Sequence, residues 1–278
     1  MSHHGRMTWA PVAIALLVTA APSPGAEDSL GGLPPIDAST SLLVVSPHPD
    51  DETLCCAGVI QRVLAAGGHA SIVWITSGDG SALSMLIVEK SPLMTREKMH
   101  DLAARRMREA RTATALLGVQ STQQFFLGYP DGGISKLLND NRLERDFAAV
   151  LDRAHPTLIL APSPEDTHPD HRASGLLTIQ TLTRRGELAQ ARYWIVHGGE
   201  GWPSPRGYMP GIPLNTPPTG ARLAPTPFAL TGAEETRKRQ AIDAYQSQMQ
   251  VMSPFLLAFV RTTELYSSSP TSTTPTPR

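Results

Sequence analysis

Short apolar runs rich in branched residues alternate along the chain with segments whose apolar residues recur at helical spacing. The runs that predict strands span residues 42–45, 71–75, 124–127, 157–160 and 192–196. The segments that predict helices span residues 52–66, 95–117, 142–154, 171–183 and 231–249. This alternation is typical of βαβ units, so we expect an α/β, Rossmann-like fold in a single domain: a mostly parallel sheet with helices on both faces.

The two ends of the chain differ from this pattern. Residues 1–26 combine Arg6, an uncharged apolar run and several small residues, which predicts a secretory signal peptide and a secreted or periplasmic protein. The apolar run is shorter than the ~20 residues of a membrane span, so we expect no stable span after leader removal. We expect a linker at 27–40, the folded domain at 41–265 and a disordered Ser/Thr/Pro tail at 266–278. A proline-rich loop is expected at 201–227 inside the domain.

Charge and cysteine content exclude several classes of function. Lys and Arg number 24 against 25 Asp and Glu, so no basic field favours nucleic acid as a partner. The two cysteines, Cys55 and Cys56, exclude a disulfide-stapled scaffold and a multi-cysteine zinc site. Adjacent Cα atoms are ~3.8 Å apart, too close for a relaxed disulfide, so we expect two buried thiols. The first predicted strand is not followed by a glycine fingerprint for nucleotides. The sequence leaves the oligomeric state open.

Imidazole and carboxylate groups cluster directly after the first and fourth predicted strands. Residues 46–52 read Ser-Pro-His-Pro-Asp-Asp-Glu, and residues 166–171 read Asp-Thr-His-Pro-Asp-His. In an open parallel sheet, ligands bind beyond the carboxyl ends of the strands. Together the clusters offer three ligands for zinc or a similar ion, with a carboxylate and a histidine left for proton transfer and oxyanion stabilisation.

The pair of motifs Pro-His-Pro-Asp-Asp-Glu and His-Pro-Asp-His resembles the PIG-L (LmbE-like) zinc de-N-acetylases over roughly residues 40–250. The resemblance implies that His48, Asp51 and His171 bind Zn²⁺ or another divalent metal. It implies that Asp50 is the general base, and that His168 stabilises the tetrahedral intermediate with Asp170 as its orienting partner.

Two further positions align with residues that relatives use to hold sugar hydroxyls or phosphate: Arg106 and Asp131. Each has a structural alternative, an ion pair with Glu109 for the arginine and a turn-forming Asp-Gly for the aspartate. Asp166 departs from the family, because some relatives have an oxyanion-donating tyrosine there. Other histidines are isolated in the sequence and are expected to be structural or exposed: His69, His100, His155 and His197.

The resemblance implies a zinc-dependent N-acetylglucosaminyl-type deacetylase, and the leader-like residues 1–26 predict that this one is exported. Its expected substrate is an amino sugar or glycoconjugate that carries an N-acetyl or other N-acyl group. The alternative is a catalytically silent sugar- or metal-binding module on the same fold. Asp50 favours the enzyme, because a binding module needs no base beside the metal ligands.

Overall fold

A computed structural model describes residue 1 and residues 32–271, so the expected leader lies outside the described residues. Its strands are β1 (Ser41–Ser46), β2 (His69–Thr76), β3 (Gln124–Tyr129), β4 (Leu158–Pro162), β5 (Ala191–Trp194), β6 (Thr226–Ala229) and β7 (Thr263–Tyr266). Its α-helices are α1 (Asp51–Ala65), α2 (Ala82–Ile87), α3 (Arg96–Leu116), α4 (Ile134–Leu137), α5 (Asn141–Ala154), α6 (Pro169–Arg185), α7 (Gly232–Asp243) and α8 (Gln246–Leu257). Short 3₁₀ turns lie at Ser121–Gln123, Leu188–Gln190 and Ala221–Leu223.

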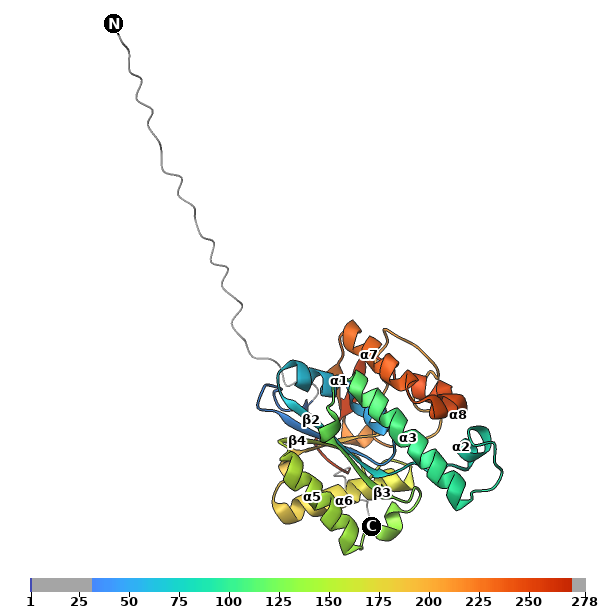
Figure 1. The fold of residues 1–278 in the computed structure, drawn as a ribbon. Helices are drawn as coiled ribbons and strands as arrows, with labels where there is room; N and C mark the ends of the chain where they lie inside the picture. The colour runs from blue at the N-terminus through green and yellow to red at the C-terminus, as the bar shows by residue number, and fades with distance from the viewer. Residues whose placement is uncertain (2–31, 272–278) are drawn as a thin grey trace.

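The predicted α/β class is confirmed by a five-stranded parallel sheet in the order β3-β2-β1-β4-β5. Helices α1, α3 and α7 lie on one side of this sheet, and α5 and α6 lie on the other (Figure 1). The central strand β1 is buried throughout Leu42–Val45, since both of its faces are covered. Val44 of β1 pairs with Ile72 on one side and with Leu160 on the other, which makes β2 and β4 its neighbours.

The single helix expected at 231–249 is two helices. Thr231 and Glu234 form a capping box at its start, but α7 ends at Asp243 and α8 begins at Gln246. Tyr245 lies between them with non-helical backbone angles and is 1% exposed. Its hydroxyl donates a hydrogen bond to Glu52 in the interior, so tertiary packing overrides the local helical spacing here.

The C-terminal part of the chain adds an antiparallel pair, β6 and β7, beside the main sheet. Ser267 pairs with Tyr193 of β5, and Ser163 donates a hydrogen bond to the carbonyl of Pro270. These contacts lie beyond residue 265, within the described part of the chain, which runs to residue 271. Residues 201–227 are mostly irregular, with a 3₁₀ turn and the first two residues of β6 at their end. Within the described part of the chain, we find no helix with the length and apolarity needed to cross a membrane.

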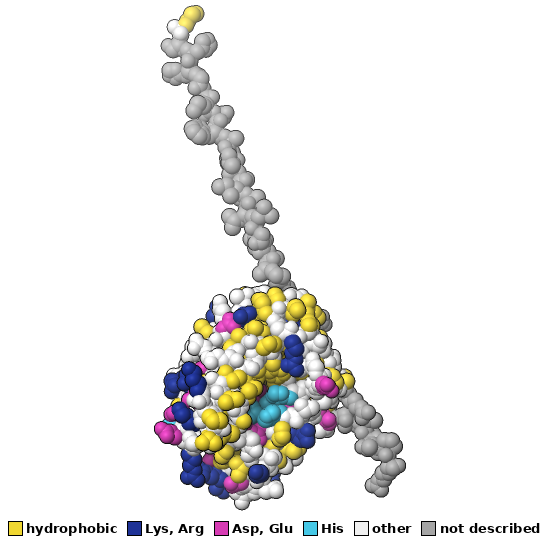
Figure 2. All heavy atoms as spheres, turned by 90° about the vertical axis from the view of Figure 1, so that its right-hand side faces the viewer, with side chains coloured by type: hydrophobic (Ala, Val, Ile, Leu, Met, Phe, Trp, Pro, Cys, Tyr) yellow, Lys and Arg dark blue, Asp and Glu magenta, His cyan; other side chains and the backbone are white. Residues whose placement is uncertain are grey.

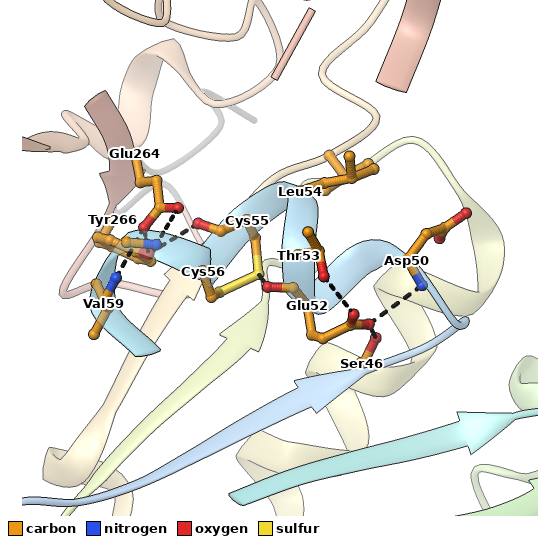
Figure 3. Close-up of a disulfide and its surroundings, with 12 residues drawn as sticks. Ser46, Asp50, Glu52, Thr53, Leu54, Cys55, Cys56, Val59, Glu264 and Tyr266 are labelled. Carbon is orange, nitrogen blue, oxygen red and sulfur yellow. Dashed lines mark hydrogen bonds between the residues drawn. A yellow bond between two sulfur atoms is a disulfide. The ribbon is translucent and has the colours of Figure 1, made fainter. Parts of the chain in front are cut away.

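Helix α1 is enclosed by buried polar contacts and contains a disulfide (Figure 3). Cys55 and Cys56 are bonded to each other, so the expectation of two thiols was wrong; burial of both side chains, 6% and 0% exposed, confines the sulfurs together. Glu264 accepts hydrogen bonds from the backbone of Gly58 (2.8 Å) and from Lys238 Nζ (2.8 Å). These contacts tie the helix that follows the first motif to β7 and α7.

Candidate active site

The two motifs meet because β1 and β4 are neighbours in the sheet and end at the same edge. Helix α1 begins at Asp51, directly after the first turn, and α6 begins at Pro169 with His168 as its N-cap. Asp50 has a φ of 128°, a strained value for a residue with a side chain. Its backbone N–H donates a hydrogen bond to Oε2 of Glu52 at 3.2 Å. This buried carboxylate thus stabilises the strained turn.

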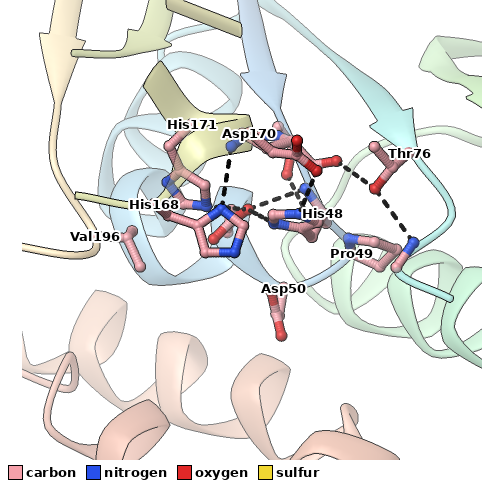
Figure 4. Close-up of polar contacts among 12 residues, drawn as sticks. His48, Pro49, Asp50, Thr76, His168, Asp170, His171 and Val196 are labelled. Carbon is pink, nitrogen blue, oxygen red and sulfur yellow. Dashed lines mark hydrogen bonds and ion pairs between the residues drawn. The ribbon is translucent and has the colours of Figure 1, made fainter. Parts of the chain in front are cut away.

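Asp51 lies at the centre of the expected ligand set. Its Oδ2 is 3.2 Å from Nδ1 of His48 and 3.1 Å from Nε2 of His171. Two ligands on one tetrahedral zinc ion, each bonded at ~2.0–2.2 Å, are separated by ~3.3 Å. Figure 4 shows His48, His168 and His171 close together, with Asp50 projecting from the turn beside them. Asp51 is therefore spaced from each expected histidine ligand as two ligands of one metal ion would be.

The second nitrogen of each expected histidine ligand faces a carboxylate. Nε2 of His48 is 3.0 Å from Asp131 Oδ1 and 3.4 Å from Asp170 Oδ2, and Nδ1 of His171 is 3.2 Å from Asp166 Oδ2. Such carboxylate–histidine pairs fix the tautomer of a metal-ligating imidazole. Nε2 of His171 is buried and has no hydrogen-bond partner among the described residues, although Asp51 lies beside it. A metal ion would satisfy this nitrogen.

The electrostatics also favour a cation at this place. Against burial, which lowers it, Asp51 and Asp166 raise the pKa of His171 to about 9. Burial also lowers the pKa of His48, yet the carboxylates of Asp131, Asp170 and Asp51 raise that pKa well above its usual value. Positive charge is thus stabilised on or between these imidazoles. Three overlapping groups have ligand atoms within 4.8 Å of one another: His48/His168/His171, Asp51/His171/His197 and His48/Asp131/Asp170.

Asp170 contacts His168 through its backbone N–H and not through its carboxylate. Its oxygens accept the backbone N–H groups of Gly132 (2.6 Å) and Ile134 (3.1 Å) and face His48. The physical reason is its place in the first turn of α6: the side chain turns toward the loop after β3, and the backbone N–H remains at the N-cap. That N–H donates to Nδ1 of His168 at 3.3 Å.

The contact of Asp170 defines the tautomer of His168. Burial, together with the nearby His48 and His171, lowers the pKa of His168 to about 4. A neutral imidazole has one N–H, and Nδ1 accepts the backbone hydrogen bond, so the proton is assigned to Nε2. His168 lines the pocket, and in this tautomer its Nε2–H is a hydrogen-bond donor.

Arg106 reaches the expected base from α3. Its Nη2 lies 3.1 Å from Asp50 Oδ2 and 2.7 Å from the carbonyl of Pro49, and its Nη1 lies 2.7 Å from the carbonyl of Gly78. Gly78 has a φ of 67°, and a Cβ there would collide with the guanidinium. Burial raises the pKa of Asp50 to about 7, although Arg106 draws it down. The alternative pair with Glu109 is absent, because that carboxylate accepts hydrogen bonds from Ser247.

Asp131 is more than a turn residue. Besides facing His48, it accepts the backbone N–H of Gly80 at 3.0 Å and lines the pocket with Arg106. His48 and the other neighbouring cations lower the pKa of Asp131, against the effect of burial. Asp131 therefore stays ionised and can orient the imidazole that it faces.

The site opens into a pocket with a volume of about 360 Å³ (Figure 2). Its lining combines polar and ionisable side chains with apolar ones. The larger apolar side chains are those of Leu54, Met252, Phe255 and Leu256. The proline-rich residues 201–227 contribute none of the pocket-lining residues, although Arg206 lies over the ring of Phe255 at 4.8 Å.

His197 was missed by the sequence analysis and lines the pocket. It follows β5, and its ring lies 5.0 Å from that of His168 and 4.7 Å from that of His171. Burial and the neighbouring His171 lower its pKa to about 3. Its position directly after the predicted strand 192–196 was the sequence signal that pointed to it.

Comparison with known families matches residues 43–182, half of the chain, to the family described as PIG-L: GlcNAc-PI de-N-acetylase. The matched segment contains both motifs and all eight expected site residues.

Individual relatives agree with this assignment. The chain is 27% identical over 155 residues to a diacetylchitobiose deacetylase from Thermococcus kodakarensis, covering 55% of this chain and 52% of the relative. It is 29% identical over 157 residues to a probable N-acetyl-alpha-D-glucosaminyl L-malate deacetylase 2 from Bacillus anthracis, covering 56% and 65%. The matches thus span about half to two thirds of these relatives. The crystal structure of the conserved protein TT1542 from Thermus thermophilus shares the fold, with a TM-score of 0.54, 23% identity and coverage of 86% and 98%.

Proposed function

Because the chain belongs to the PIG-L family of GlcNAc-PI de-N-acetylases, we propose that it hydrolyses the N-acetyl or another N-acyl group of an amino sugar or glycoconjugate. One observation carries the proposal: a buried carboxylate, Asp50, precedes Asp51, whose Oδ2 lies at metal-ligand spacing from both His48 and His171. The named relatives act on N-acetylated sugars, which supports this choice of substrate class.

We propose that Nδ1 of His48, Oδ2 of Asp51 and Nε2 of His171 hold Zn²⁺ or another divalent ion. Such an ion supplies Lewis acidity, which polarises a carbonyl and lowers the pKa of water to about 7. Asp131 and Asp170 orient His48 through its other ring nitrogen, Nε2, and Asp166 orients His171 through Nδ1.

Two other residues of the site transfer the proton and stabilise the negative charge that develops on the carbonyl oxygen. Asp50 takes a proton from the attacking water, for which a pKa of about 7 is well matched. The water oxygen bonds to the amide carbon, and the carbonyl electron pair moves onto its oxygen. His168 donates its Nε2–H to that oxyanion. The electron pair of the oxyanion then re-forms the carbonyl bond as the C–N bond breaks, the nitrogen takes the proton from Asp50, and the free amine leaves with acetic acid, which ionises to acetate in water.

Arg106 and Asp131 line the pocket, so contacts with sugar hydroxyls or a phosphate remain part of this proposal. Their observed contacts add a positioning role for each. Arg106 holds the turn that carries Asp50, and Asp131 holds His48.

Acetate release from N-acetylglucosamine conjugates by the metal-loaded full chain tests the function. We expect Asp50→Asn to retain the metal and lose about 10²–10⁴-fold in kcat. We expect His171→Ala to lose both metal and activity. Exposed His100→Ala is the matched control and should behave like the wild type. Glycan binding without acetate release would contradict hydrolysis and support the silent binding module instead.

Export is a separate proposal that rests on the pattern of residues 1–26. We propose a secreted or periplasmic location for the mature protein. Sequencing the N-terminus of protein recovered outside the cytosol tests it, and a mature N-terminus at Met1 would contradict it.

A further inference from the structure

A third strand end contributes to the pocket, besides those of β1 and β4. His197 follows β5, which pairs in parallel with β4, and its backbone is bonded on both sides to the second motif. Its N–H donates to Asp166 Oδ2 at 3.0 Å, and its carbonyl accepts from the N–H of Thr167 at 2.9 Å. The same Asp166 oxygen faces Nδ1 of His171 at 3.2 Å. One carboxylate therefore positions both His197 and an expected metal ligand.

The ring of His197 is held by packing rather than by hydrogen bonds. It is stacked on Phe255 with 5.4 Å between ring centroids and 13° between planes, and the ring of His168 lies 5.0 Å away on the pocket side. Figure 4 shows the preceding residue, Val196, beside His168 and His171. Within residues 32–271, no side chain or backbone group is hydrogen-bonded to either ring nitrogen of His197. An oriented imidazole thus faces the pocket with its polar atoms unused.

Such a group is suited to the oxyanion of amide hydrolysis. Imidazole has at least one N–H donor in either charge state. When water adds to the carbonyl carbon, the electron pair that moves onto oxygen must be stabilised, and a preorganised donor acts most strongly at that stage. His168 supplies one donor, and His197 lies next to it.

We propose that His197 is a catalytic residue, whose ring N–H donates to the oxyanion beside that of His168. This role rests on the proposed deacylation. It also accounts for Asp166, the residue that departs from the family pattern: Asp166 positions the donor instead of supplying one.

A different role for His197, as a metal ligand, is disfavoured by what lies behind its ring. One of its nitrogens is within 4.8 Å of ligand atoms of Asp51 and His171. Histidines that bind metals almost always donate the other ring N–H to a carboxylate, carbonyl or water. His48 and His171 each face a carboxylate in this way, whereas His197 stacks on Phe255.

The test compares His197→Phe, which can still stack on Phe255 but has no donor, with His197→Gln, which keeps an N–H. Each full-length variant is loaded with zinc, and three quantities are measured: metal content, kcat and KM for acetate release, and affinity for a methylphosphonamidate analogue of the tetrahedral intermediate. We expect His197→Phe to keep its metal and its KM, and to lose about 10²–10³-fold in both kcat and analogue affinity. His197→Gln should recover at least about tenfold of each loss. His100→Ala is the control for an exposed histidine.

The remaining outcomes overturn the proposal in distinguishable ways. Loss of zinc from both His197 variants would make this residue a ligand. Equal losses of kcat and analogue affinity in the Phe and Gln variants, or a lower kcat with unchanged analogue affinity, would show that His197 has only a structural role. An active wild type with an equally active His197→Phe overturns only the role of His197. An inactive wild type overturns the proposed deacylation and this role with it.

Discussion

Arg106 and Asp50 form a buried ion pair that joins α3 to the turn after β1, with 3.1 Å between Nη2 and Oδ2. The guanidinium is 5% exposed and the carboxylate 9%, so the pair is little screened by solvent. The expected base is thereby held at a strained backbone position; burial raises its pKa to about 7, and Arg106 limits that rise.

Replacement of the arginine should therefore weaken catalysis in a pH-dependent way. In Arg106→Gln the pKa of Asp50 rises, because a stabilising positive charge is lost. A larger share of the base is then protonated at neutral pH, and the acidic limb of kcat/KM moves to higher pH. At pH 7 we expect a loss on the order of 10²-fold. The pH–rate profile of acetate release checks this, with exposed Arg105→Gln as the control. An unshifted acidic limb would contradict it.

Asp166→Asn should lower metal affinity without unfolding the protein. The substitution keeps the shape of the side chain but removes the negative charge 3.2 Å from His171 Nδ1. Loss of such a partner typically costs about 10- to 100-fold in metal affinity. Competition with a chelator measures the change, and the adjacent Glu165→Gln is the control. The idea fails if the two variants retain zinc equally well.

Stability should depend on pH through Glu234, which pairs with Arg62 at 2.8 Å and completes the capping box of Thr231. These contacts lower its pKa below the usual 4.5. A lowered pKa in the folded state adds stability that is fully present above the unfolded value and is lost as pH falls through the folded one. Glu234→Ala should therefore cost about 1 kcal/mol at pH 7 and much less near pH 3.

Urea unfolding at both pH values measures this difference. Glu97→Ala is the control, because Glu97 is also an acidic residue in the first turn of a helix but is exposed. A Glu234→Ala penalty of the same size at pH 7 and pH 3 would count against the ionic explanation.

Removing only one partner of the buried Lys238–Glu264 pair should lower the free energy of unfolding strongly. Both side chains are 1% exposed, and Nζ lies 2.8 Å from Oε1. Lys238→Met leaves an uncompensated buried carboxylate and should lower the free energy of unfolding by about 3–5 kcal/mol. Adding Glu264→Gln removes that charge and keeps an acceptor for the backbone of Gly58, so the double variant should regain part of the loss.

Denaturant unfolding of the single and double variants decides this. Exposed Lys136→Met serves as the control for loss of a lysine. A double variant no more stable than Lys238→Met would show that packing, and not the unpaired charge, accounts for the loss.

The sequence was sufficient for the parts of the site that depend on strand order. Buried strands and their terminal polar clusters predicted the sheet, and the pairing of β1 with β4 brings His48, Asp51 and His171 together. The direction of a side chain within a turn was harder to predict. Asp170 precedes His171 in the chain, yet its carboxylate contacts groups in the loop after β3.

His197 and Tyr245 escaped the sequence analysis for the same physical reason. Each is placed by partners distant in sequence, Asp166 and Phe255 for the histidine and Glu52 for the tyrosine. Local periodicity carries no information on such contacts. It therefore predicted one helix where Tyr245 divides two.

Because of the strand order, the expected metal ligands and the other pocket residues come from separate parts of the chain. The expected metal ligands come from the segments after β1 and β4, whereas Ser81, Asp131 and His197 come from the segments after β2, β3 and β5. Segments at the periphery can be exchanged with little effect on the pairing of the two central strands. Redesign for a new acyl group or sugar should therefore begin with the segment around Ser81 and with α8, and leave both motifs, Asp131 and His197 unchanged.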